Sequence, residues 1–368
     1  MSRVRSSLAV IAAVIAMTFA LALAGCASPA DTATPTSAAP AGSTAPTEPR
    51  TVRVVTHDSF AVSEDLVTAF EESSGISVEF IPAGDAGEMV NRAVLSSGNP
   101  EAEVLFGIDT TLLSRAIDAE VFDPYTSSPD ALRPELRDAG LGIVTPVDDG
   151  DVCVNVDDGW FAAQGLPAPT TLEDLADPRY RGLLVVQNPA TSSPGLAFLL
   201  ATIARYGDAW PDYWERLRAN DVAVVNGWSE AYLSEFTAGG GGGSRPLVVS
   251  YSTSPPAEIV YAEDPKPERP STSVMLDGCY RQVEFAGVLR GTQDVASARA
   301  VVDWLVSPEV QADVPLSMFV FPSREGVALP EVFERFVTRP MEPLELSAEE
   351  IAAQRDAWIE QWTQLVLR

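Results

Sequence analysis

The stretch GLLVVQNPATSSPGLAFLLATIARYG, residues 182–207, joins a strand pattern to a helix pattern through a short polar turn. Residues 182–189 form an apolar run of strand length, and residues 193–207 form an apolar run of helix length. Ser192 is a residue type that caps helices, and Pro194 is favoured in their first turn. A buried strand that leads directly into a helix is the building unit of α/β proteins, so this stretch predicts an α/β fold.

The same alternation of strand and helix patterns continues on both sides of this stretch. The predicted strands are 51–57, 76–83, 102–109, 182–189, 222–225 and 246–252. The predicted helices are 64–74, 87–98, 111–121, 193–207, 211–221, 229–239, 297–314 and 347–366. This order implies mostly parallel sheets covered by helices, in two α/β units of which the second begins near Pro146.

The first 25 residues have the three parts of a secretory signal peptide. Arg3 and Arg5 precede the apolar segment Leu8–Ala24, and small residues precede Cys26. A cysteine directly after Leu-Ala-Gly resembles the lipobox of bacterial lipoproteins, so we expect a signal peptide over 1–25 and lipidation of Cys26. The alternative is an uncleaved anchor, because the apolar segment reaches the lower length limit of a spanning helix.

Residues 26–50 predict a disordered tether, because 27–50 contain no aromatic residue and no Leu, Ile or Val. The remaining body, 51–368, exceeds the size at which one core stops growing, so we expect two lobes. The first lobe is predicted at about 51–145 with a later returning segment, and the second at about 146–255 with the C-terminal helices. This plan predicts a monomer on the extracytoplasmic face of the cell membrane, held there by lipid.

The chain is strongly acidic, with a formal net charge of −28 at pH 7. A negatively charged surface repels nucleic acid and other polyanions. It favours a cationic ligand only weakly, since diffuse charge is screened within about 8–10 Å at ordinary salt. Solubility is the alternative explanation of the acidic composition.

The cysteines and the single histidine give no pattern of a catalytic or metal site. Apart from Cys26, the chain has Cys153 and Cys279, and the sequence leaves open whether they form a disulfide. His57 lies beside Asp58, but adjacent strand residues point to opposite faces, so they do not form a base with its orienting acid. We therefore expect no catalytic residue, no metal site and no cofactor.

Five polar loops follow predicted strands, and in α/β sheets ligands bind at such carboxyl ends. These loops are THDSF (56–60), GIDTT (107–111), QNPATSSPG (187–195), NGWSEAY (226–232) and SYSTSPP (250–256). In two α/β units they predict a cleft between lobes. Trp228 lies among Asn226, Gly227 and Ser229, which makes burial on all sides less favoured than a place in the site wall.

Three of these motifs, NGWSEAY, SYSTSP (250–255) and NPATSSPGL (188–196), resemble those of the thiamine-binding proteins of bacterial ABC importers. HDSF (57–60), NRAVLSSGNPEAEVLFGID (91–109) and AAQRDAWIEQW (352–362) extend the resemblance, in order, over nearly all of the chain after residue 50. It implies the two-lobed type II periplasmic-binding fold, with a cleft that captures thiamine, and often its phosphates, for a membrane permease.

The resemblance also implies a set of ligand-binding positions. Those positions are Asp85, Ala86, Ser192, Ser193, Trp228, Tyr251, Ser252, Thr253 and Ser254. Relatives favour Gly where this chain has Ala86, and they carry aromatic residues where it has VDDGDVCVNVDD (147–158), so the resemblance does not extend to an aromatic wall in that segment. The glycine tract 239–243 is an apparent insertion that predicts a flexible loop.

These residue types suit the chemistry of thiamine. Trp228 and Tyr251 can stack on flat rings and on the cationic thiazolium, and Asp85 can meet the aminopyrimidine edge. Ser192 and Ser193 either bind a phosphate at a helix N-terminus or cap that helix. Further candidates for the cleft are Asp58, Ser59, Asp109 and Tyr232, of which the two aspartates serve equally well as helix caps.

Three alternatives remain at this stage. Ferric iron commonly uses paired tyrosines in this fold, and the chain has no adjacent Tyr-Tyr pair. A polyamine would use several carboxylates, which this acidic chain can supply. A thiamine-processing enzyme would need a nucleophile, for which Cys153 is the candidate, but no base accompanies it in the sequence.

Overall fold

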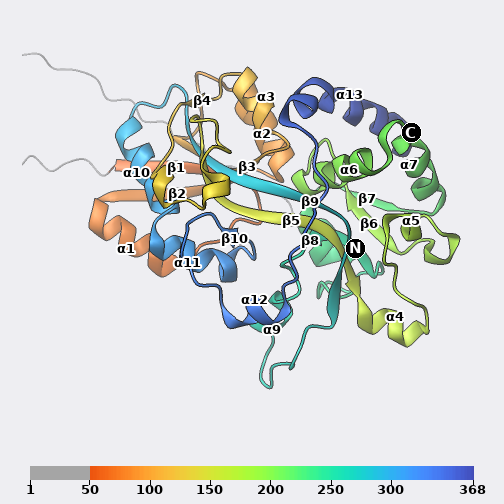
Figure 1. Ribbon diagram of the computed structural model, residues 1–368. Coiled ribbons are helices and arrows are strands. Elements are labelled where there is room, and N and C mark those ends of the chain that lie inside the picture. The colour runs from red at the N-terminus through yellow and green to blue at the C-terminus, as the bar shows by residue number, and fades with distance from the viewer. Residues whose placement is uncertain (1–49) are drawn as a thin grey trace, which may run out of the picture. The chain divides into compact units, whose positions relative to one another are not determined.

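A computed structural model describes residues 50–368 of the chain (Figure 1). The predicted signal peptide, Cys26 and all of the predicted tether except Arg50 lie outside the described residues. Arg50 is the first residue of the first strand.

Ten strands form one sheet in this part of the chain. The strands are β1 Arg50–Thr56, β2 Ile76–Pro82, β3 Val104–Asp109, β4 Phe122–Asp123, β5 Thr145–Asp157, β6 Leu184–Gln187, β7 Ala223–Val225, β8 Leu247–Tyr251, β9 Thr272–Leu289 and β10 Phe321–Pro322. Their order is β2-β1-β3-β9-β5-β8-β6-β7, with β4 beside β9 and β10 beside β5.

Helices cover this sheet and connect its strands. The α-helices are α1 Glu64–Ser74, α2 Ala86–Leu95, α3 Leu113–Asp118, α4 Asp158–Gln164, α5 Leu172–Leu175, α6 Ser193–Tyr206, α7 Trp210–Ala219, α8 Trp228–Glu230, α9 Ala257–Val260, α10 Val295–Leu305, α11 Pro308–Ser317, α12 Glu331–Phe336 and α13 Ala348–Val366. Short 3-10 turns are η1 Pro129–Ala131, η2 Pro134–Leu136, η3 Pro178–Tyr180 and η4 Gly207–Ala209, and η5 Ala231–Glu235 is a π-helix. Within residues 50–368, none of the helices combines the length and the apolar character that crossing a bilayer requires.

Two parallel groups of strands are joined by two long strands. β2, β1 and β3 pair in parallel, and β8, β6 and β7 pair in parallel. Between the groups β9 and β5 run antiparallel to each other and cross the middle of Figure 1. The predicted two-lobed α/β fold is confirmed: the first lobe is built on β2-β1-β3 and the second on β8-β6-β7.

The sequence analysis did not predict the long strands β5 and β9. Acidic residues interrupt the apolar pattern of β5, although nearly the whole strand is buried. The burial is possible because arginines form ion pairs with two of these acidic residues. Arg133 and Arg339 pair with the carboxylate of Asp149, and Arg281 Nε lies 2.7 Å from Asp151 Oδ1.

Local signals place most of the helix ends correctly. Gly75 ends α1 in the left-handed conformation, with φ of 66°. Ser347 accepts the N–H of Glu350 at 3.1 Å at the start of α13. The single helix predicted over 297–314 is wrong, because α10 ends at Leu305, and Ser307 caps a second helix that begins at Pro308, which has no N–H.

The helices near the C-terminus are distributed over both lobes. α10 packs on β1, β3 and β9, where Val301 and Val302 are fully buried. α13 packs on α7 of the second lobe, where the rings of Trp362 and Trp214 meet edge to face at 5.3 Å. α13 also reaches α3 of the first lobe, since Arg355 donates to Ser114 Oγ at 3.1 Å.

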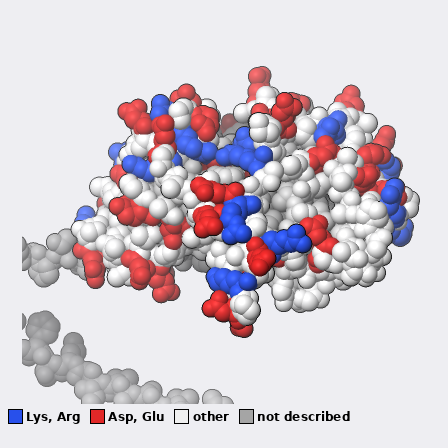
Figure 2. All heavy atoms as spheres, turned by 60° about the horizontal axis from the view of Figure 1, so that its bottom comes forward, with Lys and Arg blue, Asp and Glu red and all other residues white. Residues whose placement is uncertain are grey.

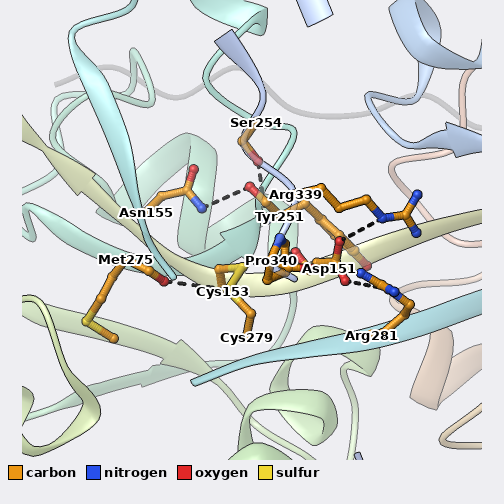
Figure 3. The surroundings of a disulfide bond; sticks show 10 residues. All are labelled: Asp151, Cys153, Asn155, Tyr251, Ser254, Met275, Cys279, Arg281, Arg339 and Pro340. Carbon is orange, nitrogen blue, oxygen red and sulfur yellow. Dashed lines mark hydrogen bonds and ion pairs between the residues drawn. A yellow bond between two sulfur atoms is a disulfide. The ribbon is translucent and has the colours of Figure 1, made fainter. Parts of the chain in front are cut away.

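A disulfide between Cys153 and Cys279 joins β5 to β9 (Figure 3), which answers the question that the sequence left open. The register of the two strands shifts here, because Val152 lies opposite Tyr280 and Val154 lies opposite Met275. The bond therefore fixes the irregular part of the crossing between the lobes. Both cysteines are buried.

Removal of this disulfide is expected to lower the free energy of unfolding by about 2–4 kcal/mol. The bond closes a chain segment of 126 residues, so its loss increases the conformational freedom of the unfolded chain. Urea unfolding of the wild-type protein with and without a reductant measures the effect. The double variant Cys153→Ser, Cys279→Ser should be insensitive to the reductant, and an equal reductant effect in that variant would contradict the assignment.

Candidate ligand-binding site

A cleft of about 480 Å³ lies between the two lobes. Its walls come from loops at the carboxyl ends of strands and from the segment after α11. The residues that line it are His57, Asp58, Ser59, Ala61, Trp228, Ser229, Tyr232, Leu233, Ala238, Gly239, Gly240, Tyr251, Ser254, Ala257, Glu258, Tyr261, Glu284, Ser317, Met318, Phe319 and Val320. Aromatic and acidic side chains are both present in this lining, and no Lys or Arg of residues 50–368 contributes to it.

Trp228 forms part of the wall of this cleft. Gly227 precedes α8 as its N-cap, so Trp228 already belongs to the helix and Tyr232 follows on the same face. The two rings stack at 5.0 Å between centroids, with an interplanar angle of 13°. The indole N–H donates to Ser250 Oγ at 2.8 Å, which fixes the ring while the side chain stays partly exposed.

The π-helix η5 and the glycine tract hold Tyr232 in place. Phe236 N–H donates to the carbonyl of Ala231, which closes the wide turn. A Cβ added at Gly239 would lie 1.6 Å from the carbonyl oxygen of Tyr232, and one at Gly241 would lie 2.1 Å from that of Leu233. The tract predicted as a flexible insertion therefore packs closely on the π-helix, which only glycine permits.

The loop after β8 contributes one side of the cleft through Tyr251 and Ser254. Burial raises the pKa of Tyr251 well above its ordinary value, so the phenol stays neutral. Ser254 Oγ lies 2.8 Å from Ser250 Oγ and accepts the N–H of Tyr251 at 3.3 Å. Ser252 and Thr253 lie below the surface, where Ser252 N–H donates to Asp151 O at 2.8 Å and Thr253 Oγ1 donates to Phe319 O.

Asp85 binds protein donors of the second lobe. Its carboxylate accepts the N–H of Ala86 at 2.6 Å as the N-cap of α2. It also accepts the N–H of Ser193 at 3.1 Å and that of Trp228 at 2.9 Å. Asp85 is buried, and so is Ala86, whose position is the first of α2. The carboxylate thus connects the first lobe to two loops of the second.

Ser192, Ser193 and Asp109 belong to the same contact between the lobes. Ser192 Oγ accepts the N–H of Gly195 at 3.4 Å, as an N-cap of α6 does. Ser193 Oγ donates to the carboxylate of Asp109, and Gln282 Nε2 donates to Ser193 Oγ at 2.9 Å. Asp109 also accepts the N–H of Thr111, so it caps the turn before α3.

Asp58 and Ser59 lie on the first-lobe side of the cleft. Asp58 is exposed and does not cap α1, whose N-cap is Ser63. Ser59 Oγ lies 2.9 Å from His57 Nδ1. Burial lowers the pKa of His57, so the imidazole is neutral near pH 7.

The sequence analysis missed Glu284 on β9 and Asp148 on β5. Glu284 faces the cleft, and its Oε1 lies 3.4 Å from His57 Nε2. Burial raises the pKa of Glu284 to about 8, and burial beside Glu284 raises that of Asp148 well above its ordinary value. A signal for Glu284 was present in the sequence, because QVEFAGV (282–288) places one acidic residue among apolar residues of a strand. A carboxylate buried in such a strand needs a partner, which marks it as a candidate for a site.

Cys153 has no free thiol in this structure, because its sulfur is bonded to Cys279. The enzymatic alternative that used Cys153 as its nucleophile is therefore not supported. Within residues 50–368, no group of three or more His, Cys, Asp or Glu side chains is placed to hold a metal ion.

Known proteins are similar to this chain over most of its length. The family model described as bacterial extracellular solute-binding protein matches residues 99–337. The thiamine-binding periplasmic proteins of Salmonella typhimurium and Escherichia coli are each 31% identical over 324 residues, which cover 86% of this chain and 93% of each relative. The chain belongs to the bacterial extracellular solute-binding protein family. The resemblance found in the sequence is thereby confirmed.

Solved structures agree with this membership. A structure titled periplasmic thiamin binding protein superposes with a TM-score of 0.75 at 29% identity, covering 86% of this chain and 96% of that one. A ferric binding protein from Campylobacter jejuni has a TM-score of 0.68 at 17% identity, covering 85% of this chain and 99% of that chain. The second likeness shows the fold alone.

Replacement of Asp85 by Asn is expected to loosen the contact between the lobes. The amide keeps the size of the side chain but presents an NH2 group toward backbone N–H donors. The loss of charge-assisted hydrogen bonds should lower the free energy of unfolding by about 2 kcal/mol. Hydrogen exchange should accelerate at least tenfold at the amides of Ser193 and Trp228.

Asp58→Asn is the matched control, because this carboxylate is exposed on the cleft side of the same lobe. Exchange at the two amides should be unchanged in the control. Equal protection of both amides in Asp85→Asn and the wild-type protein would show that the carboxylate does not hold the lobes together.

Proposed function

We propose that this protein captures thiamine in the cleft between its lobes and delivers it to a membrane importer. The observation that carries the proposal is the lining of the cleft, which combines aromatic faces with carboxyl groups and, within the described residues, lacks Lys and Arg. The volume of about 480 Å³ is in the range of small-molecule sites. The relatives of highest identity named above carry thiamine in their names.

The proposed ligand contacts use the side chains that face the cleft. Trp228, stacked on Tyr232, and Tyr251 offer aromatic faces for the pyrimidine and for the thiazolium cation, at about 0.5–2 kcal/mol for a cation over a ring. Asp58, Ser59 and Ser254 are polar groups within reach of the ligand. Asp85, Ala86, Ser192, Ser193, Ser252, Thr253 and Asp109 are proposed to shape the site from below, since they are buried and most are hydrogen-bonded within the protein.

The sequence left open whether Ser192 and Ser193 at the N-terminus of α6 bind a phosphate of the ligand or cap the helix. In this structure the carboxylate of Asp85 already accepts the N–H of Ser193, the donor that a phosphate would use. A phosphorylated ligand would have to displace this carboxylate. We therefore propose unphosphorylated thiamine as the preferred ligand.

The cellular setting of the proposal rests on the N-terminal sequence. Lipidation at Cys26 and the tether that follows would hold the body at the extracytoplasmic face of the membrane, beside an ABC permease. The body is proposed to act as a monomer and without catalysis. On the face drawn in Figure 2, basic and acidic side chains lie in small mixed groups rather than in one basic surface, in keeping with a partner other than nucleic acid.

A polyamine is the second candidate ligand, because Asp58, Glu258 and Glu284 line the cleft. Ferric iron is less well supported, since residues 50–368 offer no metal-binding group of acidic, His or Cys side chains. A thermal-shift comparison of thiamine, thiamine monophosphate, spermidine and Fe(III) separates these possibilities. Thiamine should raise the melting temperature most.

Trp228→Ala is expected to lower the affinity for thiamine at least tenfold, about 1.4 kcal/mol, because the variant loses the aromatic wall and its stack on Tyr232. Isothermal titration calorimetry on residues 50–368 measures the change. The matched control is Trp160→Ala in α4, a partly exposed tryptophan that does not line the cleft. Unchanged affinity in a folded Trp228→Ala protein would count against the assignment.

A further inference from the structure

Three acidic residues form one row across three neighbouring strands under the cleft. Glu284 on β9 lies opposite Asp109 on β3 and opposite Asp148 on β5. Directly opposed side chains of an antiparallel pair share one face of the sheet, so the three carboxyl groups point the same way. Only Glu284 of the three lines the cleft, with 18% of its side chain exposed.

Asp109 is satisfied within the protein, whereas no Lys or Arg of residues 50–368 forms an ion pair with Asp148 or Glu284, and the basic side chain beside Glu284 is His57, 3.4 Å away. Asp109 accepts from Ser193 and Thr111. Asp148 lies directly opposite Glu284 in the pairing of β5 with β9, and Asp148 Oδ2 is buried without a hydrogen-bond donor among the described residues. Two carboxyl groups can share a hydrogen bond only when one of them holds a proton.

The titratable side chains that the structure places around Glu284 are acidic or, near pH 7, neutral. The titratable groups around it are Asp148 from β5, His57 after β1, Asp109 from β3, Asp85 at the N-cap of α2 and Tyr251 from β8, and the acidic Asp58 and Glu258 line the same cleft. His57 and Tyr251 are neutral near pH 7, because burial lowers the pKa of the first and raises that of the second. The neighbouring Asp149 pairs with Arg133 and Arg339. Those arginines are therefore engaged with a different carboxylate.

The carboxyl group of Glu284 is therefore neutral in the free cleft, although the proposed ligand is a cation. Burial raises the pKa of Glu284 to about 8, so the free site holds a proton on this carboxyl group at neutral pH. The hydrogen bond that Asp148 donates favours the ionised form of Glu284 against the effect of burial, while burial and the neighbouring Glu284 raise the pKa of Asp148 well above its ordinary value, so Asp148 holds a proton of its own. A positive charge placed beside Glu284 would favour its ionised form further.

We propose that Glu284 is the cation-recognising group of the cleft and that it gives up its proton when the cationic ligand enters. This inference rests on the proposed function and adds to it a specificity residue and a proton exchange. The O–H bond of the Glu284 carboxyl group breaks, its electron pair stays on the oxygen, and the proton leaves to solvent. The net charge of the closed site is then the same before and after binding, so no unpaired charge is buried in either state.

The loss of a proton from Glu284 on binding makes the affinity for the cationic ligand rise with pH. Below the pKa of Glu284 in the free protein, the affinity for the cationic ligand falls about tenfold for each pH unit, because the proton competes with the cation. Above about pH 8 Glu284 is already ionised in the free protein and the dependence levels off. A neutral ligand of similar shape would not gain from the ionisation, so the carboxyl group selects for positive charge.

Calorimetry in buffers of different ionisation enthalpy counts the protons released when thiamine binds. At pH 7 the wild-type protein should release about one proton, and the dissociation constant should fall about tenfold from pH 6.5 to 7.5 and flatten above 8.5. Glu284→Gln should release none, and its affinity should be weaker than that of the wild-type protein at pH 8.5 and independent of pH. His57→Asn should still release a proton, because its imidazole is neutral in the free site.

The outcomes separate this inference from the function on which it rests. If thiamine binds neither at pH 7 nor at pH 8.5, the proposed function fails. If it binds to the wild-type protein without release of a proton, the role of Glu284 fails while the function stands. Loss of the release in His57→Asn, with retention in Glu284→Gln, would assign the proton to His57 and overturn the proposal. The proton count on the wild-type protein requires no variant to fold.

Discussion

Burial of carboxyl groups on the two crossing strands is the constraint on which the rest of this structure depends. β5 and β9 are buried along most of their length because they lie between the parallel strand groups of the two lobes, yet β5 carries Asp148, Asp149 and Asp151. A buried carboxylate without a partner costs several kcal/mol, so each must be paired, protonated or neutralised by a ligand. The way each acid meets this requirement divides the crossing into a structural part and a functional part.

The structural part is the face of β5 on which arginines form ion pairs with the acidic residues. Arg133, Arg281 and Arg339 come from segments far apart in the sequence and converge on Asp149 and Asp151 beside the disulfide (Figure 3 shows Asp151, Arg281 and Arg339). These pairs attach the stretch after α12 and the turn of η2 to the same strand. These ion pairs and the disulfide thereby hold together the crossing strands, whose register shifts between Val152 and Val154.

The sequence predicted the parts of the fold that depend on local signals. Gly75, Ser192 and Ser347 end or begin helices as their residue types indicate, and Trp228 faces the cleft as its polar neighbours suggested. Strand β5 was not predicted, because its buried acidic residues are stabilised by arginines from distant parts of the chain, which no local sequence pattern reveals. The role of Asp85 depends on partners 108 and 143 residues away, which spacing alone cannot supply.

The functional part is the opposite face, where no Lys or Arg of residues 50–368 forms an ion pair with Asp148 or Glu284. Adjacent strand residues point to opposite faces, so Asp149 meets its cations on one side of β5 while Asp148 points toward the other. There Glu284 is its neighbour, and within residues 50–368 no Lys or Arg lines the cleft above. A site meant only for stability would gain by placing an arginine in this row or an apolar residue in it. The proposed recognition of a cation would account for Glu284 in the lining of the cleft, because the ligand would then supply the missing positive charge.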